Sequence, residues 1–136
     1  MPVISPRVRH LTPRWMFLVA LVLGLGACVT PSIPIPPPNP ARMTFTVSIV
    51  DTTSGAVFSY PPDSNYHNGV AYIYNRDKGV GVIQNVNPDD SIGPSPRFAA
   101  ALGDQIVVSV QTVDQTESTC IRLRDGTGQD ANSCSP

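Results

Sequence analysis

The chain of 136 residues carries nine basic and ten acidic side chains, for a formal net charge of −1. No basic patch follows residue 14, so the phosphates of a nucleic acid are not an expected partner. The length fits one domain with a core of moderate size.

An apolar, uncharged run of 13 residues extends from Trp15 to Ala27. The segment before it contains Arg7, Arg9 and Arg14 and no acid. A helix that crosses a bilayer needs about 20 apolar residues, so this run is too short to span one. Its length and its positively charged flank are typical of a secretion signal.

The run ends in Leu25-Gly26-Ala27-Cys28, and here the sequence resembles a bacterial lipoprotein signal. The resemblance implies cleavage before Cys28, a diacylglycerol on its thiol, and membrane lipid as a partner in the cell envelope. In a diderm bacterium, Val29 after the cysteine would favour the outer membrane. The alternatives are an uncut signal anchor, which would need a 13-residue span, and a chance cysteine after an ordinary signal.

Cleavage before Cys28 would leave six basic and ten acidic side chains, a net charge of −4. It would also leave Cys120 and Cys134 as a pair, which is expected to oxidise outside the cytoplasm. The disulfide would hold residues 125–136, a polar tail, and contribute roughly 3 kcal/mol. Two free thiols are the alternative.

Residues 28–41 form the predicted tether between the signal, residues 1–27, and the domain, residues 42–136. Six prolines between positions 31 and 40 remove backbone donors and favour polyproline II. At about 3.1 Å per residue, such a spacer reaches roughly 40 Å. A proline motif that binds an aromatic groove is the alternative interpretation.

Alternation with period two begins after Arg42 and predicts a strand whose apolar face holds Met43, Phe45, Val47 and Ile49. A turn follows over residues 51–55, and Gly55 is expected to supply its positive φ. Further strands are predicted over residues 56–60, 70–74, 80–86, 105–113 and 119–124. Residues 97–102 fit either a strand or a helical turn.

These short strands, with no convincing helical periodicity, predict an all-β, small single-domain β-sandwich of immunoglobulin-like or transthyretin-like type. The residues Phe45 to Asp51, Gly55, and Gly69 to Ala71 resemble transthyretin-like and carboxypeptidase-regulatory-like domains. The resemblance implies a sandwich and no particular activity.

Little in the sequence suggests catalysis. His67 is the only histidine after residue 28; it could join Asp63, but no G-x-S-x-G motif supplies a nucleophile. Asp89 and Asp90 are interpreted as solvated charge. We therefore expect a non-catalytic protein without cofactor.

A histidine metal cluster is excluded within one chain, and no metal site is expected. Asp51 with Asp104, or the segment from Asp125 to Asp130, offers the nearest approach to calcium ligands. The second segment lacks the glycine and the closing glutamate of a calcium loop, and a turn-rich tail explains it equally well.

The tyrosines are the best candidates for recognition. Tyr72 and Tyr74 lie two positions apart and share a strand face, and Tyr66 precedes them in a loop. Exposed, these three would stack on sugars or fill a partner's groove; buried, they would be ordinary core residues. The sequence thus predicts an interaction or structural module in the envelope, with a glycan- or ligand-binding module second and an enzyme third.

Overall fold

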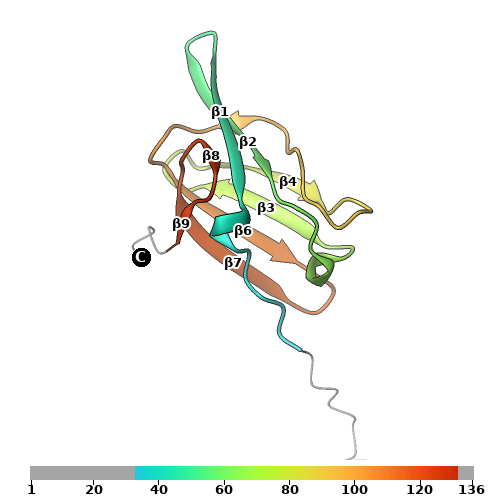
Figure 1. The fold of residues 1–136 in the computed structure, drawn as a ribbon. Coiled ribbons are helices and arrows are strands. Elements are labelled where there is room, and N and C mark those ends of the chain that lie inside the picture. Colours follow the sequence, from blue (N-terminus) through green and yellow to red (C-terminus); the bar gives the residue numbers. More distant parts are fainter. Residues whose placement is uncertain (1–32, 132–136) are drawn as a thin grey trace, which may run out of the picture. The chain divides into compact units, whose positions relative to one another are not determined.

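The computed structural model describes residues 33–131. Nine strands and two single-turn 3₁₀ helices occur in this range (Figure 1). In chain order they are η1 (Pro40–Arg42), β1 (Thr44–Val50), β2 (Thr53–Ser59), η2 (Ser64–Tyr66), β3 (Val70–Asn75), β4 (Val80–Asn85), β5 (Phe98–Ala99), β6 (Gln105–Gln111), β7 (Thr116–Arg122), β8 (Gly126–Thr127) and β9 (Asp130–Ala131).

The strands form two sheets that pack face to face. One has the order β5-β2-β1-β8 and the other the order β4-β3-β6-β7-β9. All the strand pairs are antiparallel. The predicted all-β sandwich is therefore confirmed.

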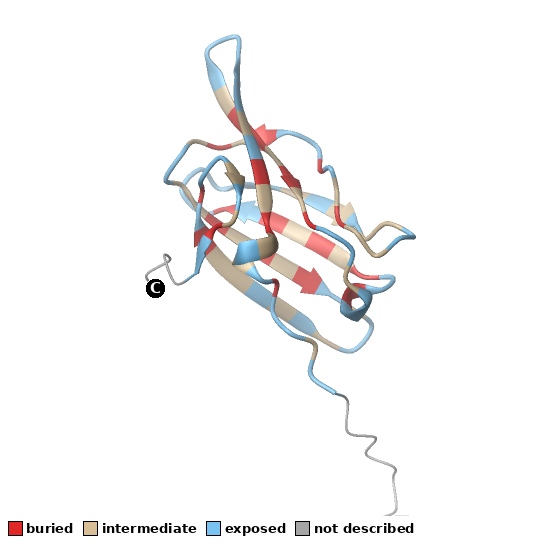
Figure 2. Ribbon diagram, viewed as in Figure 1, coloured by how far each residue is buried: buried red, intermediate tan, exposed pale blue. Residues whose placement is uncertain are grey.

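The core lies between the sheets and follows the alternation of the strands (Figure 2). On β6, Ile106, Val108 and Val110 are buried, while the residues between them are only partly covered. Phe45 of β1 and Phe58 of β2 are paired in register, and their ring centroids lie 5.0 Å apart. Each contributes a large apolar area to the hydrophobic stabilisation.

The β1–β2 hairpin projects beyond the sandwich (Figure 1). For this reason the predicted inner face of β1 is buried only in part: Phe45 is covered completely, whereas Ile49 is 74% exposed. The two-residue turn is formed by Asp51 and Thr52, with φ of 48° and 69°. Positive φ at both positions is what a type I′ hairpin turn requires.

Gly55 is not part of that turn, contrary to the expectation from the sequence. It lies in β2 opposite Ser48, and the Arg97 side chain covers it. A Cβ at this position would meet the guanidinium of Arg97, which donates hydrogen bonds to the carbonyls of Ser48 and Thr53. The glycine is therefore explained by close approach of a side chain and not by backbone conformation.

Strand pairing at the sheet edges defines the structure of two segments, residues 97–102 and the polar tail. Residues 97–102 contribute a strand, β5, which pairs with β2. The polar tail contributes β8, which pairs with β1, and β9, which pairs with β7. Both sheets therefore hold the tail up to Ala131.

Candidate functional site: the proline-rich segment on the sandwich

Residues 33–41, called the proline segment below, lie against the sandwich instead of standing apart as a free spacer. Ile33 belongs to the same compact unit as the strands. Pro38 is buried, and Ile35 packs against the hydrophobic core. The part of the predicted tether that the structure describes is thus a component of the domain.

Prolines lack a backbone donor, so most of the polar links to this segment use its carbonyl groups as acceptors. The Tyr66 hydroxyl donates to the carbonyl of Pro36 over 3.0 Å, and the Thr119 hydroxyl donates to that of Pro38 over 2.6 Å. The Gln129 backbone N–H donates to the carbonyl of Pro40 over 2.9 Å. Donors from a loop, a strand and the tail therefore converge on one segment.

Gln115 makes a two-way contact with the start of the segment. Its Oε1 accepts a hydrogen bond from the backbone N–H of Ile35 at 2.8 Å. Its Nε2 donates to the carbonyl of Ile33 at 3.0 Å. Gln115 lies in the turn between β6 and β7, so this turn and the start of the segment are joined.

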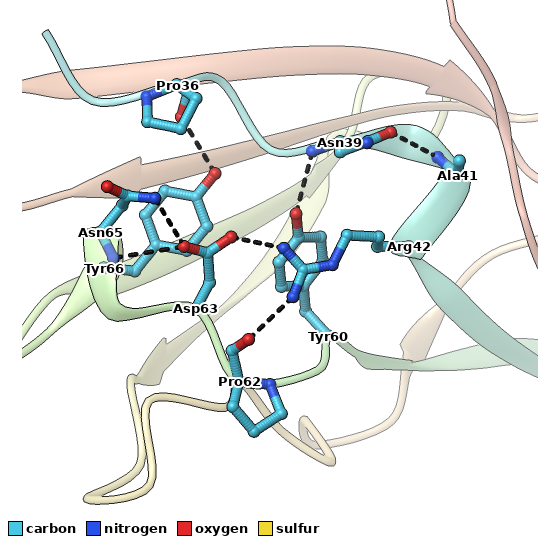
Figure 3. Close-up of polar contacts among 9 residues, drawn as sticks. All are labelled: Pro36, Asn39, Ala41, Arg42, Tyr60, Pro62, Asp63, Asn65 and Tyr66. Carbon is cyan, nitrogen blue, oxygen red and sulfur yellow. Dashed lines mark hydrogen bonds and ion pairs between the residues drawn. The ribbon is translucent and has the colours of Figure 1, made fainter.

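A second cluster holds the other end of the segment (Figure 3). The Tyr60 hydroxyl accepts from the backbone N–H of Asn39 at 3.1 Å. The Arg42 guanidinium lies 4.9 Å from the centroid of the Tyr60 ring, a cation–π distance. Arg42 also donates to the carboxylate of Asp63 and to the carbonyl of Pro62.

Asp63 links this cluster to the η2 turn. Asp63 is the N-cap of this turn, and its Oδ1 accepts from the backbone N–H and the side-chain amide of Asn65. Burial alone would raise the pKa of Asp63, but the hydrogen bonds from Asn65 and the contact with Arg42 outweigh burial. They hold the pKa below its ordinary value of 3.8.

The structure separates the three tyrosines proposed for ligand binding. Tyr66 is fully buried, its ring centroid lies 5.9 Å from that of Tyr60, and burial raises the pKa of its hydroxyl well above the ordinary value. Tyr72 and Tyr74 remain on the outer face of β3, where Tyr74 is 46% exposed. Tyr66 is a core residue, because the proline segment closes over its loop.

His67 contacts a different carboxylate from Asp63, the partner considered in the sequence analysis. His67 Nδ1 lies 2.6 Å from the carboxylate of Asp90, while Asp63 is engaged by Arg42. Asp89 is exposed, and hydrogen bonds from Ser91 lower its pKa. These contacts stabilise two neighbouring loops.

The acids considered for calcium are used in other ways. Asp104 accepts hydrogen bonds from Asn75 and from the backbone N–H of Ala101. Asp125 accepts from the backbone N–H of Val47, and Asp130 forms an ion pair with Arg124. Within residues 33–131, no three His, Cys, Asp or Glu side chains are grouped as metal ligands would be.

Cys28 and Cys134 lie outside the described residues, so the lipidation and the disulfide stay predictions. Cys120 lies on β7, next to Ile121, which pairs with Ala131 of β9. The described part of the chain contains no helix with the length and hydropathy that a membrane crossing requires.

The proline segment and β7 together line an open groove of about 590 Å³. Its lining includes Pro36 to Pro40, the β7 residues Ser118 to Cys120, and Ala131 of β9. The pattern of prolines predicted an extended segment, but nothing local to it indicated that Gln115 and Thr119, some 80 positions away, would hold it.

Comparison with known proteins adds no family to this description. The chain matches no family model, and no curated protein or solved structure is significantly similar to it.

Proposed function

We propose that this protein is a lipid-anchored, non-catalytic interaction module of the bacterial cell envelope, held by acyl chains on Cys28. The motif Leu25-Gly26-Ala27-Cys28 supports the anchor, and the course of the proline segment sets how far the domain can stand from it. Because Gln115 holds this segment on the sandwich from the carbonyl of Ile33 onward, only residues 29–32 link the held part of the chain to Cys28. Even fully extended, this link reaches about 17 Å, well short of the 40 Å expected for a free spacer.

A domain held this close to a membrane acts on its immediate surroundings. One surface available for a partner is the projecting β1–β2 hairpin (Figure 1). Three apolar side chains are exposed at the hairpin or near its base: Ile49 at 74%, Val50 at 51% and Leu102 at 64%. Val47, Ile49 and Leu102 line a groove of about 650 Å³ at this base. Apolar side chains exposed together, as Ile49 and Leu102 are at this groove, are typical of protein-binding sites.

The anchor is tested by metabolic labelling with an alkyne fatty acid in a bacterial host that processes lipoproteins. The wild-type chain is expected to take up the label and to float with membranes. The variant Cys28→Ala is expected to lose the label. An unlabelled wild type, or a labelled C28A, would overturn the anchor.

The interaction surface is tested by photo-cross-linking in cells. A benzophenone amino acid at position 50 is expected to capture a discrete envelope protein. The same residue at position 89, in an exposed loop, serves as the matched control. Equal capture at both positions, or none at position 50, would contradict a protein-binding role for the hairpin.

A second candidate, a glycan-binding surface, rests on the outer face of β3. Tyr72 pairs with Ile83, which is 66% exposed, and the ring of Tyr74 lies over Gly81. A flat aromatic and apolar face suits stacking on sugar rings. Soluble oligomers of N-acetylglucosamine should then raise the melting temperature of the wild type and not of Tyr74→Ala; no shift in the wild type would exclude this candidate.

A further inference from the structure

The end of the sandwich at which the described chain begins carries two very exposed apolar side chains. Ile33 is 87% exposed, and Val113, in the turn between β6 and β7, is 93% exposed. We call Ile33 together with residues 112–115 the anchor end.

The anchor end is one connected unit. Gln115 binds both Ile33 and Ile35, and the turn is closed by a hydrogen bond from the N–H of Thr112 to the carbonyl of Gln115 at 2.8 Å. Ile33 and Val113 are therefore presented together by a turn that the strands hold in place. The β1–β2 hairpin projects from the opposite end of the sandwich (Figure 1).

The chain itself indicates what covers this end. Only residues 29–32 separate Ile33 from the lipid-bearing Cys28 of the proposed function. The anchor end contains one charged residue, Asp114, and the processed chain carries a net charge of −4. Attraction to anionic lipid therefore does not explain a contact with the membrane, whereas burial of apolar side chains does.

We propose that the anchor end rests on the lipid surface, with Ile33 and Val113 inserted between the headgroups and the hairpin directed away from the membrane. This proposal rests on the lipidation of Cys28. It assigns the protein a fixed orientation, in which the partner-binding hairpin is the part farthest from the bilayer.

A single-tryptophan experiment tests the orientation. The chain has one tryptophan, Trp15, and cleavage before Cys28 removes it. The variants Val113→Trp and Val50→Trp each place one tryptophan at an exposed site, at the anchor end and at the hairpin respectively. Both are purified as the processed, lipidated protein that begins at Cys28, and are reconstituted into phosphatidylcholine vesicles with or without brominated acyl chains.

The emission of V113W should shift to shorter wavelength on reconstitution and lose intensity with brominated lipid, at low and at high salt. The emission of V50W should do neither, which controls for the affinity of tryptophan itself for membranes. In V113W, the added change Gln115→Ala should reduce the quenching, because it releases Ile33 from the turn.

The possible failures are distinct. If intact mass shows acylated protein and the vesicles carry it, but V113W is not quenched, the orientation is overturned while the anchor stands. Equal quenching of V50W overturns the orientation in the same way and indicates a domain that lies on its side or tumbles. Intact mass without acyl chains on Cys28 overturns both proposals.

Discussion

The hydroxyl of Tyr66 donates a hydrogen bond of 3.0 Å to the carbonyl of Pro36 and joins the η2 turn to the proline segment. Both partners belong to stretches that look like exposed polar loop or free spacer in the sequence. Their contact converts residues 33–41 into part of the domain and shortens the link to Cys28. The orientation argued above depends on contacts of this kind.

Removal of that hydrogen bond should loosen the segment. Tyr66→Phe keeps the buried ring and deletes only the hydroxyl that donates to Pro36, so we expect a loss of about 1 kcal/mol in the free energy of unfolding. Urea denaturation measures this. Tyr72→Phe deletes a hydrogen bond to Gln111 on the exposed face and should change stability by less than about 0.5 kcal/mol. Equal effects of the two variants would contradict the role given to Tyr66.

Asp63 should make stability depend on acid pH. Its pKa is lower in the folded state than its ordinary value of 3.8, so its contribution is present above that value and lost as pH falls through the folded pKa. Asp63→Asn should therefore be less stable than the wild type at pH 7, and the difference should shrink below about pH 4. Thermal melts from pH 2 to pH 8 test this. The exposed Asp114→Asn should show no such convergence.

Much of the sandwich could be predicted because its longer strands carry local apolar patterns. Phe45 falls on the apolar face that alternation gives to β1, whereas β6 is recognised by a nearly continuous apolar run from Ile106 to Val110. The strands β8 and β9 have two residues each and no pattern of their own, so only their pairing with β1 and β7 defines them.

The site was harder to predict than the fold. Tyr66 lies in a polar stretch, and its burial depends on a proline segment 30 positions away. Gln115 carries no sequence signal, because an exposed turn glutamine looks the same whether or not it binds a distant backbone. Asn75 is also buried. Its side-chain amide forms hydrogen bonds with Ala99, Asp104, Asp77 and Lys78, and the local sequence does not indicate them.

Arg97 and Gly55 should act as a unit in holding the hairpin. Arg97→Ala removes the bonds to the Ser48 and Thr53 carbonyls, and Gly55→Ala places a Cβ 2.4 Å from the guanidinium carbon, which must then move. Each variant should lose about 1 kcal/mol, and the double variant should lose no more than the larger single loss. Faster amide hydrogen exchange at Val50 and Thr53 would localise the effect. Strict additivity would show that the two residues are independent.

The predicted disulfide should lock the tail onto β7. Ala131 pairs with Ile121, so the chain already lies beside the neighbour of Cys120, three positions before Cys134. The oxidised protein should be lighter than its reduced form by two hydrogens, and Cys134→Ser should lose roughly 3 kcal/mol in the chain-entropy model. Ser133→Ala is the control, because it leaves both thiols in place. Maleimide labelling of Cys120 or Cys134 without reductant would contradict the pairing, and the hold on the tail would then reduce to the contacts of β8 and β9.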